Sequence, residues 1–281
     1  MMKRATVRLA MFAVAVCVCA ASGAAESPGQ VAESTLPPSE EQVQKHEPSS
    51  AAISATDSPP QEWRRELSLY GWFSGMSSTV TARGEETTTE VEFKDILKAL
   101  DFASFGHLEV QRGKWGLFSE LDFVKLSTAS EVRLPDRFVR LDTATTLKET
   151  MVEVGGLRSF DGERVGLDVL AGARYVRFDI DTRLGPRESS TTKDWVDPLV
   201  GGRLRLRLSE KWQASLRGDV GGFGVGSKLT TNAVAVVSCK LSDRYSLGFG
   251  YRYLDIEKEG NRGTKLDSTT YGPVFGVTMR F

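Results

Sequence analysis

The sequence predicts an all-β fold, a closed antiparallel up-and-down β-barrel that spans a membrane and follows a disordered tail. Ten segments alternate apolar with polar side chains, and each is long enough to cross a membrane. Short turns between them alternate with longer polar connections. No stretch reaches the roughly 20 apolar residues of a spanning helix, so an integral location requires a closed sheet in which every backbone group is paired.

Residues 1–25 have the features of a secretory signal peptide. A basic start precedes an apolar run over residues 9–21, and small residues then favour cleavage near Ala24 or Ala25. The basic residues are Lys3, Arg4 and Arg8. A retained anchor is the alternative, but the apolar run is shorter than the roughly 20 residues that a helical span needs.

Removal of the signal peptide leaves 33 basic and 37 acidic residues, a net charge of −4, which gives no support to nucleic-acid binding. Cys239 is the one cysteine left, so no intramolecular disulfide is expected. Residues 26–63 are rich in Pro, Ser and Glu and contain almost no large apolar side chains. Such a segment cannot offset the entropy of ordering, so we expect a disordered periplasmic linker before a barrel over 64–281.

The predicted strands alternate with period two and end in turn residues. They cover 66–80, 103–112, 115–129, 146–160, 164–181, 195–208, 211–222, 228–241, 244–257 and 268–281. Long polar connections are expected at 82–101, 130–145, 182–194 and 258–267. Ten strands return both ends of the barrel to one side, and eight or twelve strands are the alternatives. A secreted β-sandwich competes, but its strands would be only about 5 to 6 residues long.

One face of each predicted strand is apolar. In 195–208, for example, small and apolar residues alternate with Asp197, Leu199, Gly201 and three arginines. We expect the apolar face to contact lipid and the polar face to line the lumen. Aromatic residues near strand ends are candidates for interfacial girdles: Trp115, Trp212, Tyr245 and Phe281. Arg158 would point outward near the rim and would have to snorkel.

The same alternation predicts a set of charged side chains inside the barrel. The acids are Glu109, Glu120, Asp122, Glu149, Glu153, Asp168 and Asp219. The bases are Arg174, Arg203, Arg205, Arg207, Arg217, Lys240, Arg252 and Arg280. A barrel of this size is little wider than one that its own side chains fill, and buried charges must pair or be hydrated. We therefore expect cross-lumen ion pairs that plug the barrel, with a narrow conduit between acidic and basic walls as the alternative.

Candidate chemistry is sparse. His46 lies in the predicted linker, and His107 is expected to face the lumen beside Glu109, as a base and its orienting group would. No nucleophile stands out nearby, so neither catalysis nor a cofactor is predicted, and metal ligands are too few for a metal site. The glycines of 221–227 favour a tight extracellular hairpin, because a phosphate-binding turn would need a following helix.

A short amphipathic helix is predicted within 93–102. Four apolar residues follow helical spacing, Phe93, Ile96, Leu97 and Leu100. Since this segment lies in the long connection after the first strand, the helix would cap the barrel mouth or enter it.

The sequence resembles bacterial outer-membrane β-barrel proteins, broadly the small group that includes outer membrane proteins A and W. The last strand carries the features of their assembly signal, Gly276, Met279 and Phe281, and the runs WVDPLVGG, RGDVGGFGVGS and GYRYLDI are also similar. The resemblance covers about 64–281 and implies a location in the cell outer membrane. It also implies two partners, outer-membrane lipid and the barrel-assembly machinery.

Three functions fit these predictions. The first is a structural or surface barrel with a charge-paired lumen. The second is a narrow porin for small polar solutes, and the third, a distant alternative, is an outer-membrane enzyme.

Overall fold

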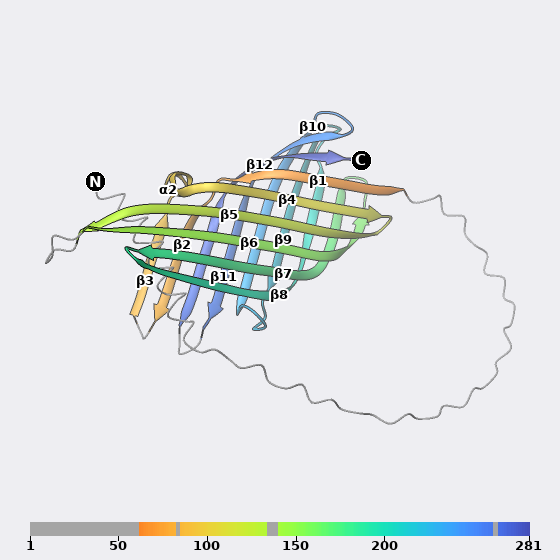
Figure 1. Cartoon of the computed structure of the whole chain (residues 1–281). Helices are drawn as coiled ribbons and strands as arrows, with labels where there is room; N and C mark the ends of the chain where they lie inside the picture. The colour runs from red at the N-terminus through yellow and green to blue at the C-terminus, as the bar shows by residue number, and fades with distance from the viewer. Residues whose placement is uncertain (1–61, 83–84, 134–139, 261–263) are drawn as a thin grey trace, which may run out of the picture.

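The computed structural model describes residues 62–82, 85–133, 140–260 and 264–281. The predicted signal peptide and all but the last two residues of the predicted linker lie outside the described residues. In the described part, the chain forms long antiparallel strands that close into a barrel (Figure 1).

Ten strands form the closed ring, in the order β1-β4-β5-β6-β7-β8-β9-β10-β11-β12, and β12 pairs with β1 to close it. The ring strands are β1 (Trp63–Trp72), β4 (Leu100–Arg112), β5 (Trp115–Arg133), β6 (Arg140–Asp161), β7 (Val165–Leu184), β8 (Arg187–Arg207), β9 (Trp212–Gly221), β10 (Leu229–Lys240), β11 (Tyr245–Glu259) and β12 (Lys265–Arg280). Two further strands, β2 (Gly75–Ala82) and β3 (Glu85–Val91), and the helix α2 (Phe93–Ala99) complete the described elements. The predicted ten-stranded antiparallel barrel is therefore confirmed.

The two ends of the barrel differ. Tight connections join strands at one end, which we call the turn end, at 113–114, 162–164, 208–211 and 241–244. The start of β1 and the end of β12 lie at this same end, because Glu66 pairs with Arg280. We call the opposite end the loop end.

The predicted first strand, 66–80, is wrong as one continuous element. The chain breaks it at Phe73 and Ser74 into β1 and β2. Pro273 on the neighbouring strand has no N–H to donate to this segment, although its carbonyl oxygen accepts from the Phe73 N–H at 2.9 Å. β2 then continues along β12, while β3 pairs back onto β2. The expected loop 82–101 therefore contains a strand as well as the helix.

The loops expected at 130–145 and 182–194 are also largely strand, since β5 to β8 continue beyond the predicted bounds. At the polar ends of β7 and β8, contacts between facing side chains hold the two strands together. Arg183 bonds Glu188 at 2.7 Å, and the Ser190 hydroxyl donates to Asp181 at 2.6 Å. Cross-strand pairs of this kind stabilise a sheet without any apolar face.

The exterior of the ring is apolar, as the alternation predicted. Exposed residues on the barrel wall include Leu69, Leu117, Val154, Val169, Val200, Leu216, Phe249 and Phe275. Arg158 points outward as expected, and its guanidinium lies 5.2 Å from the centre of the Trp115 ring near the turn end. No helix in the described ranges is long and apolar enough to cross a membrane.

The connection between β9 and β10 joins two paired antiparallel strands, as the hairpin expected at 221–227 requires, and its last part packs against β8. Gly222, Phe223 and Gly224 all have positive φ values, which permit a sharp turn of the chain. The buried Ser227 donates its N–H and its hydroxyl to the Asp197 carboxylate, both at 2.7 Å. Asp197 also accepts from the Trp195 indole N–H at 3.0 Å.

We expect Asp197→Ala to release this loop from β8, because buried donors on Ser227 and Trp195 would lose a charged acceptor. The cost is about 1.5 to 3 kcal/mol for each bond. Trypsin would then cleave after Lys228 at least several times faster than in the wild type. Cleavage kinetics of the folded, detergent-solubilised chain measure this, with Asp243→Ala at the turn end as the control. Equal cleavage rates for the wild type and Asp197→Ala would show that the carboxylate does not hold the loop.

Candidate functional site

A layer of buried ion pairs crosses the middle of the lumen. Arg174 on β7 donates to Glu153 on β6 at 2.7 Å and to Asp219 on β9 at 2.6 Å. Arg174, Glu153 and the Asp219 carboxylate are fully buried. Inside a barrel wall, such an arrangement is favourable only when each charge meets its partners at close range.

Two more arginines extend this layer to the other strands. Arg217 on β9 bonds Glu120 on β5 at 2.9 Å and Glu153 at 2.6 Å. Arg252 on β11 lies 2.9 Å from Asp122, and it also donates to the Tyr70 hydroxyl at 2.9 Å. We call this set the central layer: Glu120, Asp122, Glu153, Arg174, Arg217, Asp219 and Arg252. Since its members come from β5, β6, β7, β9 and β11, the layer spans the ring.

A second group of charges lies between the central layer and the turn end. Arg203 makes a forked contact with Glu109, at 2.7 and 3.0 Å, and its Nε donates to Asp168 at 2.7 Å. Arg205 donates to the other Asp168 oxygen at 2.7 Å and to Asp161 at 2.7 Å. Bidentate arginine contacts of this kind are among the stronger polar contacts in proteins.

His107 connects the two groups. Its Nε2 lies 3.6 Å from Glu109, the pair expected from the sequence, and its Nδ1 lies 3.5 Å from Glu120 on the neighbouring strand. Its ring also stacks on Phe118, with centroids 6.3 Å apart. These contacts place the imidazole as a link between two carboxylates.

Three predicted lumen bases lie apart from both groups. Arg280 pairs with Glu66 at 3.0 Å near the turn end. Lys240 contacts Asp243 in the adjacent turn at 2.6 Å, and this ammonium lowers the pKa of the Asp243 carboxyl. Arg207 is exposed at the end of β8. All three line a cavity of about 670 Å³ that occupies the turn-end half of the lumen.

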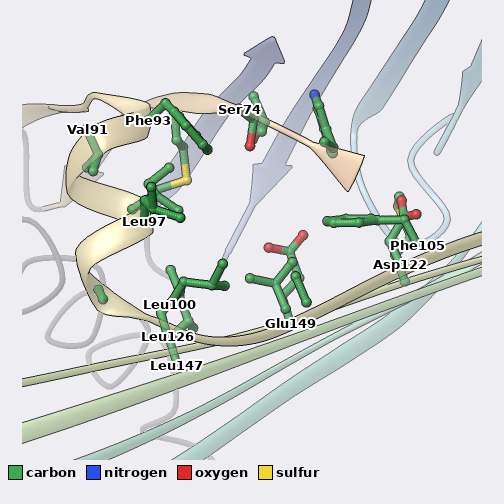
Figure 2. A pocket seen from close by; sticks show the side chains of 18 of the residues that line it. Ser74, Val91, Phe93, Leu97, Leu100, Phe105, Asp122, Leu126, Leu147 and Glu149 are labelled. Atoms are coloured by element: carbon green, nitrogen blue, oxygen red, sulfur yellow. The ribbon is translucent and has the colours of Figure 1, made fainter. Parts of the chain in front are cut away.

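The loop-end half holds a different, mostly apolar cavity of about 120 Å³ (Figure 2). Its walls combine barrel side chains with the predicted amphipathic face of α2: Phe93, Ile96, Leu97, Leu100, Val124, Leu126, Leu147, Met151 and Ile180. The helix prediction for 93–102 is therefore correct in kind, although α2 ends at Ala99. The helix borders the barrel mouth and forms one side of this cavity.

Glu149 faces this apolar cavity rather than the central layer (Figure 2). Among the described residues, its carboxylate makes no hydrogen bond or ion pair. Asp122, which also lines the cavity, differs because it contacts Arg252 and the Tyr70 hydroxyl. Two carboxyl groups thus meet at the boundary between the charged and apolar parts of the lumen.

Sequence reasoning omitted several participants. Tyr70 and Glu66 occupy inward positions on the first strand, and Asp161 lies at the end of β6. Asp197 lies on the polar face of its strand, as the alternation indicated, but it was not included in the predicted charge network. The alternation that found the other charges could have found Glu66 and Tyr70. No group of three or more His, Cys, Asp or Glu side chains within the described ranges is arranged to hold a metal ion.

Comparison with known proteins gives a structural likeness only. No protein-family model matches the chain, and no curated protein matches it. The outer membrane protease OmpT from Escherichia coli is 8% identical with a TM-score of 0.53, over 79% of this chain and 97% of OmpT. The translocator domain of the autotransporter NalP from Neisseria meningitidis is 13% identical, with a TM-score of 0.41, over 78% and 88%. Ail from Yersinia pestis is 13% identical, with a TM-score of 0.33, over 78% and 99%.

At such low identity, the likeness to OmpT identifies the fold and nothing finer. It agrees with the closed ring of ten antiparallel strands, the apolar exterior and the charged interior. By its fold, the chain is a closed ten-stranded antiparallel β-barrel, similar to the bacterial outer membrane protease OmpT.

Proposed function

We propose that the protein is a structural or surface barrel whose lumen is closed to ions and solutes by the central layer. The observation that carries this proposal is the full burial of Arg174 between Glu153 and Asp219. Arg217 on β9 and Arg252 on β11 extend the layer across the lumen to acids on β5. A ring of ten strands is little wider than one of eight, whose interior side chains just fill the space.

A narrow porin is the second candidate, and the cavity of about 670 Å³ at the turn end favours it. Basic residues outnumber acidic ones on its wall, as an entrance for small anions would require. The central layer lies between this cavity and the loop end. Conduction would therefore need that layer to move.

We propose no catalytic role. The protease activity named for OmpT belongs to that protein, and a comparable activity here would need a base next to a nucleophile or a bound water. In the described part of the chain, the contacts of His107 are two carboxylates and the Phe118 ring. These contacts support a role for His107 in the ion-pair network.

Planar-bilayer recordings distinguish a closed barrel from a porin. We expect no stepwise openings from the wild type, because the central layer fills the cross-section. Replacement of Glu153, Arg174 and Asp219 together by alanine should produce openings, since it removes three of the seven side chains of the central layer along with their charges.

The matched control replaces an exposed ion pair at the loop end, Arg183→Ala with Glu188→Ala, and should stay silent. Stepwise wild-type openings whose ion selectivity changes on Arg205→Glu would instead establish the porin.

A further inference from the structure

We propose that the apolar cavity beside α2 binds a small organic cation, an apolar body about the size of one aromatic ring that carries a protonated amine. Glu149 is the residue that pairs with the amine. This inference does not depend on whether the central layer conducts, because the cavity lies on the loop-end side of that layer.

The size and lining of the cavity define the apolar body. Its volume of about 120 Å³ compares with roughly 150 Å³ for an engineered apolar cavity that binds benzene. The barrel wall contributes Leu126, Leu147 and Ile180 to the lining of the cavity. The helix contributes Phe93 and Leu97 (Figure 2). Burial of a ring-sized apolar group against these side chains is favourable by about 25 cal/mol for each Å² removed from water.

The charge of the site selects a cation. Glu149 has no ion-pair partner in the described residues, and the neighbouring Asp122 shares Arg252 with Glu120. The four acids of the central layer are contacted by its three arginines and by His107, whereas none of these cations contacts Glu149. A carboxylate in an apolar wall is costly when it has no partner. An ammonium group would supply that partner, whereas an anionic ligand would face two carboxyl groups.

The sheet topology gives this cavity an entrance. β3 pairs with β2, and the first residues of β4, Leu100 to Ala103, pair with β5. β3 is the last strand of the sheet order, and β1 pairs with β4 only from Phe105 onward, so β3 and the start of β4 each have a free edge at the loop end. The ring of strands is thus divided at the loop end, with α2 connecting the two edges (Figure 1). Leu97 on α2 lines the cavity and is 53% exposed, so it lies at the opening.

Titration of the full chain in a neutral detergent with benzylammonium tests the proposal, with empty micelles as the blank. Benzyl alcohol and benzoate are probes of the same size with neutral and negative groups. We expect saturable binding of benzylammonium by calorimetry, and weaker binding of the other two. Glu149→Gln should reduce benzylammonium affinity by about tenfold or more, as expected for loss of a hydrogen bond to a charged group.

Two further variants keep the outcome clear. Glu188→Gln makes the same chemical change on β8, outside the cavity, and should bind benzylammonium as the wild type does. Leu97→Trp places a larger ring at the exposed entrance and should weaken benzylammonium and benzyl alcohol alike. Absence of saturable wild-type binding, equal affinity in Glu149→Gln, or benzoate binding as tight as that of benzylammonium would each overturn the proposal.

Discussion

Arg174→Met should destabilise the folded barrel by about 3 to 5 kcal/mol, the cost of leaving buried charges without their partner. The substitution keeps most of the side-chain volume and removes one of the two guanidinium groups that bond both Glu153 and Asp219. Arg217 would remain in contact with both carboxylates, but Glu153 and Asp219 would then share one cation in place of two. Urea unfolding of the lipid-embedded protein, followed by tryptophan fluorescence, measures the change.

A compensating variant separates charge from packing. Adding Glu153→Gln and Asp219→Asn to Arg174→Met neutralises the stranded acids, so we expect it to recover a substantial part of the lost stability. Arg183→Met is the matched control, because the Arg183 and Glu188 side chains are well exposed and exposed pairs contribute little. If Arg174→Met and Arg183→Met have the same small effect, the central layer is not a determinant of stability.

The sequence was sufficient to predict the orientation of most charged side chains. In strand 195–208, strict alternation predicted that Arg203 and Arg205 face the lumen, and both do so. Orientation requires only the two-residue period of a strand. The partners could not be predicted in the same way, because Arg217 and Glu120 are 97 residues apart and meet only across the closed ring.

Glu149 and Glu153 show most clearly what the alternation along a strand cannot predict. They lie four residues apart on the same face of β6, and alternation therefore assigns both to one charge network. In the structure, Glu153 is at the centre of the ion-pair layer while Glu149 faces an apolar cavity. The difference arises from the division of the sheet near Pro273 and from the position of α2, which are tertiary features. The period of β6 carries no information about either one.

The sequence pattern also could not show where the strands end at the loop end of the barrel. Segments such as 187–194 were predicted as loops because they are polar, but polarity identifies contact with water and does not exclude a strand. Once β7 and β8 leave the apolar band, their polar side chains continue to pair with each other, as Thr192 does with Asp179 at 2.6 Å. The end of the lipid-facing band is therefore visible in the sequence, whereas the end of the strand is not.

Because this apolar band forms the outer wall, we expect the substitution Leu216→Arg to cause a large loss of stability. Leu216 on β9 is 54% exposed on the outer wall, between exposed apolar residues at the two ends of the strand, Trp212 and Val220. A cationic side chain on the lipid face of a barrel costs about 2 to 4 kcal/mol at the bilayer midplane and much less near the interface. We expect a loss within that range for Leu216→Arg, measured by urea titration in phospholipid vesicles.

Two controls determine whether lipid is the cause. Val225→Arg introduces the same side chain in the connection between β9 and β10, where Val225 is 72% exposed, and should change stability little because water solvates the guanidinium. Leu216→Ala removes the leucine without adding charge and should cost less than Leu216→Arg. If all three variants were equally stable in vesicles, the apolar outer wall would face something other than hydrocarbon. A clear loss confined to Leu216→Arg would instead place the middle of β9 at membrane depth, since only a low-dielectric surrounding penalises an exposed charge so strongly.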